Sequence, residues 1–108
     1  MKLEWETHGV AVNPWLEEFA RTTVAFAVWH YARRVETVEI RFDRTVDLDR
    51  NESVRCTLTA RTPDGPVSSG ATGSDASEAT REAADLLEVA LHRPARTRSH
   101  EISRSLAA

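Results

Sequence analysis

The sequence predicts an α+β protein, a two-layer sandwich in which two helices cover one face of a four-stranded sheet. Three observations predict it: the 108 residues suffice for one domain, stretches of period-two and helical hydrophobicity alternate, and their order is β-α-β-β-β-α. With this order the first two strands can pair in parallel through a right-handed crossover, and the later strands can pair through hairpins. The other face of the sheet is then open.

The first strand and the first helix are predicted near the N-terminus. Apolar and polar residues alternate over residues 2–8, and Gly9 ends the strand. Asn13 and Pro14 predict a helix start, because asparagine caps free N–H groups and proline at the first helical position loses no hydrogen bond. The helix is predicted to run to residue 33 or 34. Its core face is Leu16, Ala20, Thr23, Val24, Ala27 and Tyr31.

Three strands are predicted in the middle of the chain, where hydrophobicity returns to a period of two. Their inward sides are Val38, Ile40 and Phe42; Val54, Cys56, Leu58 and Ala60; and Val67, Ser69 and Ala71. The polar residues 44–51 are predicted to form a loop. Pro63, Asp64 and Gly65 predict a tight turn that returns the last strand as a hairpin, because proline presets one backbone angle and glycine allows a positive one.

A second helix is predicted after the fourth strand. Asp75 and Glu78 have the spacing of a capping box. The core stripe of this helix is Ala76, Ala79, Thr80, Ala83, Leu87, Ala90 and Leu91, whose small members allow close approach to the sheet. Pro94 should end the helix near Arg93. The sequence therefore predicts a domain over residues 1–93 and a basic, flexible tail over residues 94–108.

Composition excludes several classes of protein. One cysteine, Cys56, cannot form an intramolecular disulfide or a multi-cysteine metal site, and it is predicted to be a buried, inert thiol. We find no histidine pair at metal-ligand spacing, no nucleophile–base pair and no cofactor motif, so neither an enzyme nor a bound metal or cofactor is expected. Without a signal peptide or an apolar run of about 20 residues, the chain is expected to be cytoplasmic, with no membrane partner.

An ordered set of residues resembles a known family. The set comprises Asn13, Pro14 and Leu16; Val38, Glu39 and Ile40; Arg55 and Cys56; Gly65, Pro66, Val67 and Ala71; and Asp75, Ala79, Ala83, Ala84, Asp85, Leu87, Glu88 and Leu91. Over about residues 2–93 the chain resembles the ribosome hibernation-promoting factor and ribosome-associated inhibitor A family, also called sigma-54 modulation proteins. This resemblance implies a fold like the double-stranded RNA-binding domain.

The resemblance also implies a function. Members of the family are not enzymes; they dock in the decoding region of the small ribosomal subunit and inhibit translation during stress or stationary phase. This chain would be a short form, without the C-terminal dimerisation domain of the longer members. It departs from the family in having no basic residue over residues 22–29 and in having Leu86 and Val89 where basic residues are common.

Two interpretations of the functional surface remain open. In the first, the chain binds ribosomal RNA through its remaining basic residues, Arg81, His92, Arg93, Arg96 and Arg98. The alternative is that these basic residues belong to a solvated tail that binds nothing. The net charge of the chain is −3, but residues 91–108 carry four arginines and one glutamate, and such basic tails are common. In the second, the same fold has lost ribosome binding and is a protein-interaction or homodimerising module, acting through an apolar patch of Trp15, Phe26 and Trp29.

The alternative for the aromatic patch is that the sheet edge covers it, or that the tail does so through Ile102 and Leu106. Stacking of these rings on unpaired bases is disfavoured by the neighbouring Glu18. On the outer face of the sheet, basic Arg41, Arg55 and Arg61 lie among acidic side chains. Cross-strand ion pairs are expected there rather than a ligand site.

Overall fold

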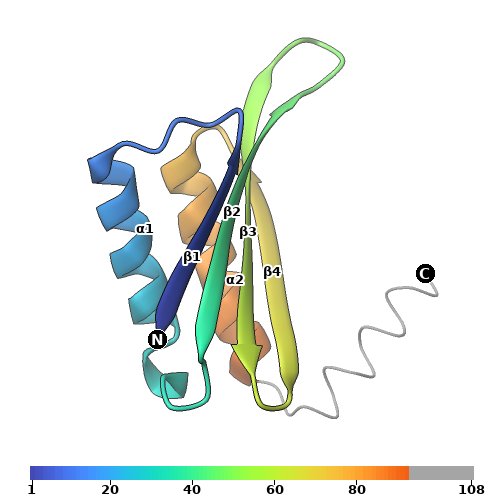
Figure 1. The fold of residues 1–108 in the computed structure, drawn as a ribbon. Coiled ribbons are helices and arrows are strands. Elements are labelled where there is room, and N and C mark those ends of the chain that lie inside the picture. The colour runs from blue at the N-terminus through green and yellow to red at the C-terminus, as the bar shows by residue number, and fades with distance from the viewer. Residues whose placement is uncertain (93–108) are drawn as a thin grey trace, which may run out of the picture.

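A computed structural model describes residues 1–92 and confirms the predicted α+β class and element order. The elements are β1 (Lys2–His8), α1 (Pro14–Ala27), the short 3₁₀ helix η1 (Trp29–Tyr31), β2 (Thr37–Val46), β3 (Glu52–Thr62), β4 (Gly65–Gly73) and α2 (Ala76–His92). Figure 1 shows α1 and α2 side by side, with the sheet next to them. No helix within residues 1–92 combines the length and the apolarity that a membrane span needs.

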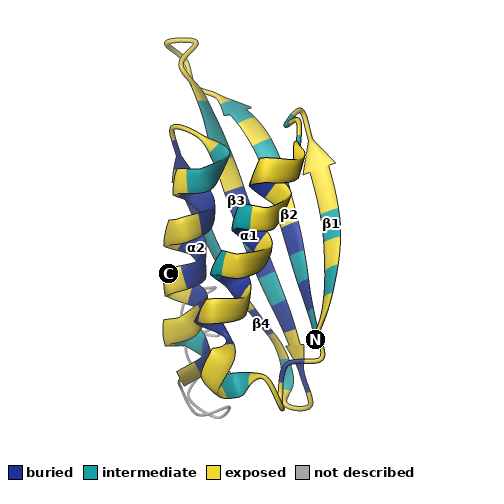
Figure 2. Ribbon diagram, turned by 90° about the vertical axis from the view of Figure 1, so that its left-hand side faces the viewer, coloured by how far each residue is buried: buried dark blue, intermediate teal, exposed yellow. Residues whose placement is uncertain are grey.

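The four strands form one sheet in the order β1-β2-β3-β4. β1 pairs with β2 in parallel, and β2–β3 and β3–β4 are antiparallel pairs. The register places Ile40 of β2 beside Trp5 of β1 and Leu58 of β3. Both helices cover the same face of the sheet, and their buried sides are turned toward it (Figure 2). The opposite face of the sheet is open, as the sequence predicts.

The core lies between the sheet and the two helices. The predicted inward residues of β2, Val38, Ile40 and Phe42, are fully buried, as are Cys56, Leu58 and Ala60 of β3. From α1 the core receives Leu16, Ala20, Val24 and Ala27, and from α2 Ala79, Thr80, Ala83, Ala84, Leu87 and Leu91. Thr23 and Tyr31, predicted for this core, are only partly buried.

The small residues of α2 and β4 allow helix and strand to approach closely. A Cβ atom on Gly73 would lie 2.8 Å from the backbone nitrogen of Ala79, closer than packed atoms come. One turn further along, the Ser69 hydroxyl donates a hydrogen bond of 2.7 Å to the Ala83 carbonyl. β4 and α2 are therefore closely packed at Gly73 and joined by a side-chain-to-backbone hydrogen bond at Ser69.

The first helix ends earlier than predicted, at Ala27 instead of residue 33 or 34. The Tyr31 amide donates to the Val28 carbonyl and the Arg34 amide to the Tyr31 carbonyl, so the chain tightens into 3₁₀ geometry and then reverses. The reversal buries Val28 and Val35, which the helical periodicity leaves outside the core face. Burial of these two side chains favours the early end over continued helix.

The predicted loop over residues 44–51 is shorter in the structure, because the antiparallel pairing continues to Val46 opposite Glu52. What remains is a tight turn over residues 47–51. Its backbone is held by the Asp47 carboxylate, which accepts hydrogen bonds of 2.9 Å from the amides of Asp49 and Asn51. The β2–β3 hairpin projects beyond the helices, at the end of the molecule opposite η1 (Figure 1).

Candidate functional site

Basic residues gather where the two helices end. β1 and β4 run in the same direction, so α1 and α2, which follow them, both return toward the same end of the molecule. There the Tyr31 hydroxyl and Nδ1 of His92 are hydrogen-bonded at 2.9 Å. This bond places His92, the last residue of α2, beside the turn that contains Arg33 and Arg34. We call His92, Arg33 and Arg34 the basic end.

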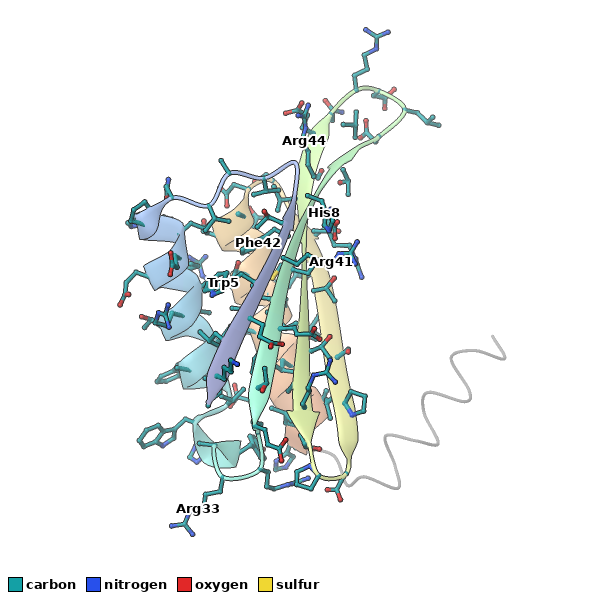
Figure 3. The ribbon with its side chains drawn as sticks, in the orientation of Figure 1. Trp5, His8, Arg33, Arg41, Phe42 and Arg44 are labelled. Carbon is teal, nitrogen blue, oxygen red and sulfur yellow. The ribbon has the colours of Figure 1, made fainter. Side chains whose placement is uncertain are left out.

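The two arginines of the basic end differ in their partners. The Arg34 guanidinium donates to the Asp64 carboxylate of the β3–β4 turn at 2.9 Å. Arg33 is exposed and makes no ion pair within residues 1–92, and Figure 3 shows its side chain pointing away from the body of the protein. In the sequence these arginines are indicated only as the predicted end of the first helix. The element order could have indicated this cluster, because it brings the C-terminal ends of both helices to the same end of the sheet.

The structure separates the sequence-predicted RNA-binding residues. Arg81 lies eleven residues before His92 on α2, which is roughly 16 Å along a helix. Its guanidinium carbon lies 5.8 Å from the centre of the Phe19 ring, a cation–π geometry that directs it toward α1. Arg93, Arg96 and Arg98 lie outside the described residues, directly after the basic end. Arg81 is therefore not part of the same cluster as His92.

The exposed surface of the helical layer is acidic. It carries the carboxylates of Glu17, Glu18, Glu78, Glu82, Asp85 and Glu88. Within α1 and α2 as described, two arginines lie among them: Arg21, which pairs with Glu17 at 3.2 Å, and Arg81. Because these negatively charged carboxylates repel negatively charged phosphate groups, this surface is unsuited to bind an RNA backbone. Any phosphate contact is expected at the basic end and in the residues that follow it.

A row of aromatic side chains runs along α1 and continues into η1, where Trp29 is the first residue. Trp15, Phe26 and Trp29 are 64%, 82% and 71% exposed. Phe19 lies between them and stacks on Trp15, with ring centres 5.3 Å apart. We call these four residues the aromatic stripe. The alternative in which the sheet edge covers Trp15, Phe26 and Trp29 does not hold, because within residues 1–92 they remain exposed; the alternative of cover by Ile102 and Leu106 lies outside the described residues.

Phe19 is the member of the stripe that sequence analysis missed, since it borders the core arc in a helical projection. The signal that finds it is the spacing 15, 19, 22, 26, 29, which alternates steps of four and three residues. Such steps place residues on one line along a helix. On α1 the stripe is therefore a second apolar line, separate from the line that faces the core, and Trp29 follows it at the start of η1.

The outer face of the sheet carries balanced charges, as predicted. The Arg41 guanidinium donates to the Asp43 carboxylate at 2.9 Å and lies 3.3 Å from Glu6. The hydrogen bond and charge of Asp43 raise the pKa of Arg41. Arg61 pairs with Glu39 at 3.3 Å. Arg55 alone of the three predicted arginines has no ion pair within the described residues; it lies 3.5 Å from the Thr72 hydroxyl.

The single cysteine is inert, as the sequence predicts. Cys56 is fully buried in the core, and this burial raises the pKa of its thiol to about 11. The neutral thiol therefore predominates near pH 7, and a thiol in this form is a poor nucleophile. Among residues 1–92 no group of three or more histidine, cysteine, aspartate or glutamate side chains is arranged to hold a metal ion.

Comparison with known proteins identifies similar folds. No protein-family model and no curated protein matches the sequence. The structure is similar to the Protein Y N-terminal domain of Thermus thermophilus, with a TM-score of 0.64 and 14% identity over 82% of this chain and 93% of that one. It is also similar to a ribosomal subunit interface protein of Coxiella burnetii, with a TM-score of 0.56 and 15% identity over the whole of both chains. The chain thus shares the fold of these two proteins, which supports the family resemblance at the level of the fold.

Proposed function

We propose that the chain is a non-catalytic ribosome-associated factor that binds the small ribosomal subunit and inhibits translation during stress or stationary phase. The observation that carries this proposal is the likeness in fold to the Coxiella burnetii ribosomal subunit interface protein, which spans the full length of both chains. The family resemblance in the sequence, from the helix start at Asn13 to Leu91, supports it independently.

The basic end is the surface we assign to RNA. Arg33 and His92 lie there, and Arg93, Arg96 and Arg98 follow in the sequence, so we assign five basic groups to the RNA-binding segment. In this proposal residues 1–93 are the folded domain and residues 94–108 its basic extension. Inhibition would follow from occlusion, because a protein held by phosphate contacts needs only to occupy the path of messenger or transfer RNA.

Cosedimentation with purified small subunits across a potassium chloride series tests the proposal. Each phosphate contact adds roughly one unit to the log–log slope of affinity against salt. We expect wild-type protein to pellet at low salt and to be released as salt rises. The triple variant Arg93→Gln, Arg96→Gln, Arg98→Gln should bind more weakly with a slope lower by about two to three units, and Arg33→Gln should lose about one.

Arg50→Gln is the matched control, because Arg50 is an exposed arginine in the β2–β3 turn, at the opposite end of the molecule. Its binding and salt slope should equal those of wild type. Absence of pelleting at low salt, or an equal loss in Arg50→Gln and Arg33→Gln, overturns the proposal. Inhibition is measured separately, as reduced output of a translation reaction to which wild-type or triple-variant protein is added.

The aromatic stripe favours a second candidate function, a protein-interaction module that has lost ribosome binding. Three large rings that stay exposed on α1 and η1 form an apolar patch of the kind found at protein interfaces. The acidic helical surface around them disfavours RNA. In the sedimentation experiment this candidate gives no pelleting at any salt concentration, together with protein association that Trp29→Glu abolishes.

A further inference from the structure

The aromatic stripe is nearly symmetric about its midpoint. Thr22 stands at the centre, Trp15 and Trp29 lie seven residues on either side, and Phe19 and Phe26 lie three and four residues away. Steps of three and four residues are the spacing at which a helix packs side chains against a second helix. A stripe with this symmetry fits a reversed copy of itself.

We infer that the stripe is a homodimer interface, in which α1 and the first residue of η1 pack antiparallel against the same segment of a second copy, with Thr22 at the crossing point. Trp15 then lies opposite Trp29 of the second copy, and Phe19 lies opposite Phe26. A two-fold interface has this property, since every contact occurs twice. The threonine at the centre, with exposed Ala25 beside it, is small enough for the helices to approach while the larger rings interlock on either side.

Charge favours the antiparallel arrangement over the parallel one. Glu17 and Glu18 lie near the start of the stripe, and Arg33 lies beyond its end. An antiparallel pair brings the acidic start of one helix toward the basic end of the other. A parallel pair would bring Glu18 toward Glu18, and it would also align the two helix dipoles unfavourably. The same acidic residues make a nucleic acid a poor occupant of the stripe.

The area of the stripe suits a weak dimer. An aromatic side chain buries about 150–250 Å² when fully covered. With the exposures of Trp15, Phe26 and Trp29, the three rings supply roughly 300–550 Å² per copy. A standard interface buries about 800 Å² per partner, so the rim of α1 must contribute the rest. We therefore expect reversible association at roughly micromolar concentrations.

Sedimentation velocity over a range of protein concentrations tests the inference on the full chain. Wild-type protein should shift from monomer to dimer as concentration rises, while Trp29→Glu and Phe26→Glu should stay monomeric. Leu48→Glu is the matched control, because Leu48 is fully exposed in the β2–β3 turn, away from the stripe, and this variant should dimerise like wild type. Circular dichroism confirms that each variant is folded.

Chemical cross-linking tests the geometry. In a Thr22→Cys variant the new thiols face each other across the two-fold axis, so a short bismaleimide should link two copies efficiently. Glu82→Cys, on the exposed side of α2, should be linked much less. Cys56 is buried and should not react in the folded protein.

A protein that is monomeric at every concentration, or a dimer that Trp29→Glu and Phe26→Glu leave intact, overturns the inference. Equal cross-linking at positions 22 and 82 overturns the antiparallel geometry. The inference does not rest on ribosome association: a monomer that cosediments with small subunits contradicts the dimer alone, and a dimer that fails to cosediment contradicts the proposed function alone.

Discussion

The Tyr31 hydroxyl and Nδ1 of His92 lie 2.9 Å apart, although 61 residues separate them in the chain. The bond joins the turn after α1 to the last residue of α2. It is an exposed hydrogen bond between two side chains. Its contribution to stability is therefore expected at the lower end of the usual range.

Removal of this hydroxyl should loosen the end of α2. We expect Tyr31→Phe to lower the free energy of unfolding by about 0.5 kcal/mol, measured by urea denaturation, and to speed hydrogen exchange in the last turn of α2. A double-mutant cycle with His92→Ala isolates the pair. Strictly additive effects of the two substitutions would show that the contact contributes nothing.

Gly73→Ala should destabilise the protein far more than Gly70→Ala. The new Cβ at position 73 would lie 2.8 Å from the Ala79 backbone nitrogen and 3.1 Å from Glu78 Cβ, so α2 itself must move. At position 70 the new atom would lie 2.5 Å from Nη2 of Arg55, the far end of a flexible side chain that can swing aside. We expect a loss of about 1–3 kcal/mol for Gly73→Ala and little for Gly70→Ala, both by urea denaturation. Equal losses would contradict the close strand–helix contact.

Stability should fall at alkaline pH because of Cys56. Burial raises the pKa of its thiol from 9.0 to about 11, so above pH 9 the unfolded chain loses this proton more readily than the folded protein. The thiol contributes fully to the free energy of unfolding below pH 9. As pH rises from 9 toward 11 this contribution is lost, and the free energy of unfolding falls by roughly 2–3 kcal/mol in total.

The measurement for Cys56 is the urea midpoint from pH 8 to 11 for wild type and Cys56→Ala. The difference in slope between the two belongs to the thiol, since other titrating groups are common to both. A thiol reagent at pH 8 supplies a second readout: Cys56 should react slowly in buffer and rapidly in urea. Fast reaction of the folded protein would contradict a buried thiol.

Asp75 should stabilise the start of α2 in its ionised form. Its carboxylate accepts hydrogen bonds of 2.8 Å from the Glu78 amide and the Ser77 hydroxyl, and these bonds lower the pKa of Asp75. The stabilisation is present above the ordinary carboxyl pKa and is lost as pH falls through the lowered value.

Two variants separate the cap of Asp75 from its charge. Asp75→Ala should lower the urea midpoint at pH 7, because it removes the acceptor. Asp75→Asn keeps an acceptor without a titrating group, so it should stay close to wild type at pH 7 and show a weaker loss of stability below about pH 4. An Asn variant with the same acid dependence as wild type would assign that dependence to other carboxylates.

Local patterns predicted the sheet well. Val38, Ile40 and Phe42 alternate with polar residues and are all fully buried, and the turn at Pro63 and Asp64 joins β3 to β4 as a hairpin. Both depend on interactions between residues close in sequence. The end of α1 was predicted wrongly, because Val28 and Val35 leave the helical period to reach a core whose other walls come from distant strands.

The sequence by itself determined the element order, the inward face of each central strand and the chemistry of the isolated cysteine, because backbone periodicity and side-chain type act over a few residues. Only the tertiary structure decided which residues meet. It placed Arg81 over Phe19, His92 beside Tyr31 and Arg33 at the same end, and it left the aromatic stripe uncovered within residues 1–92. These relations depend on where two helices, separated by three strands, come to lie on one sheet, and that placement is driven by burial of the apolar faces of both helices against the sheet.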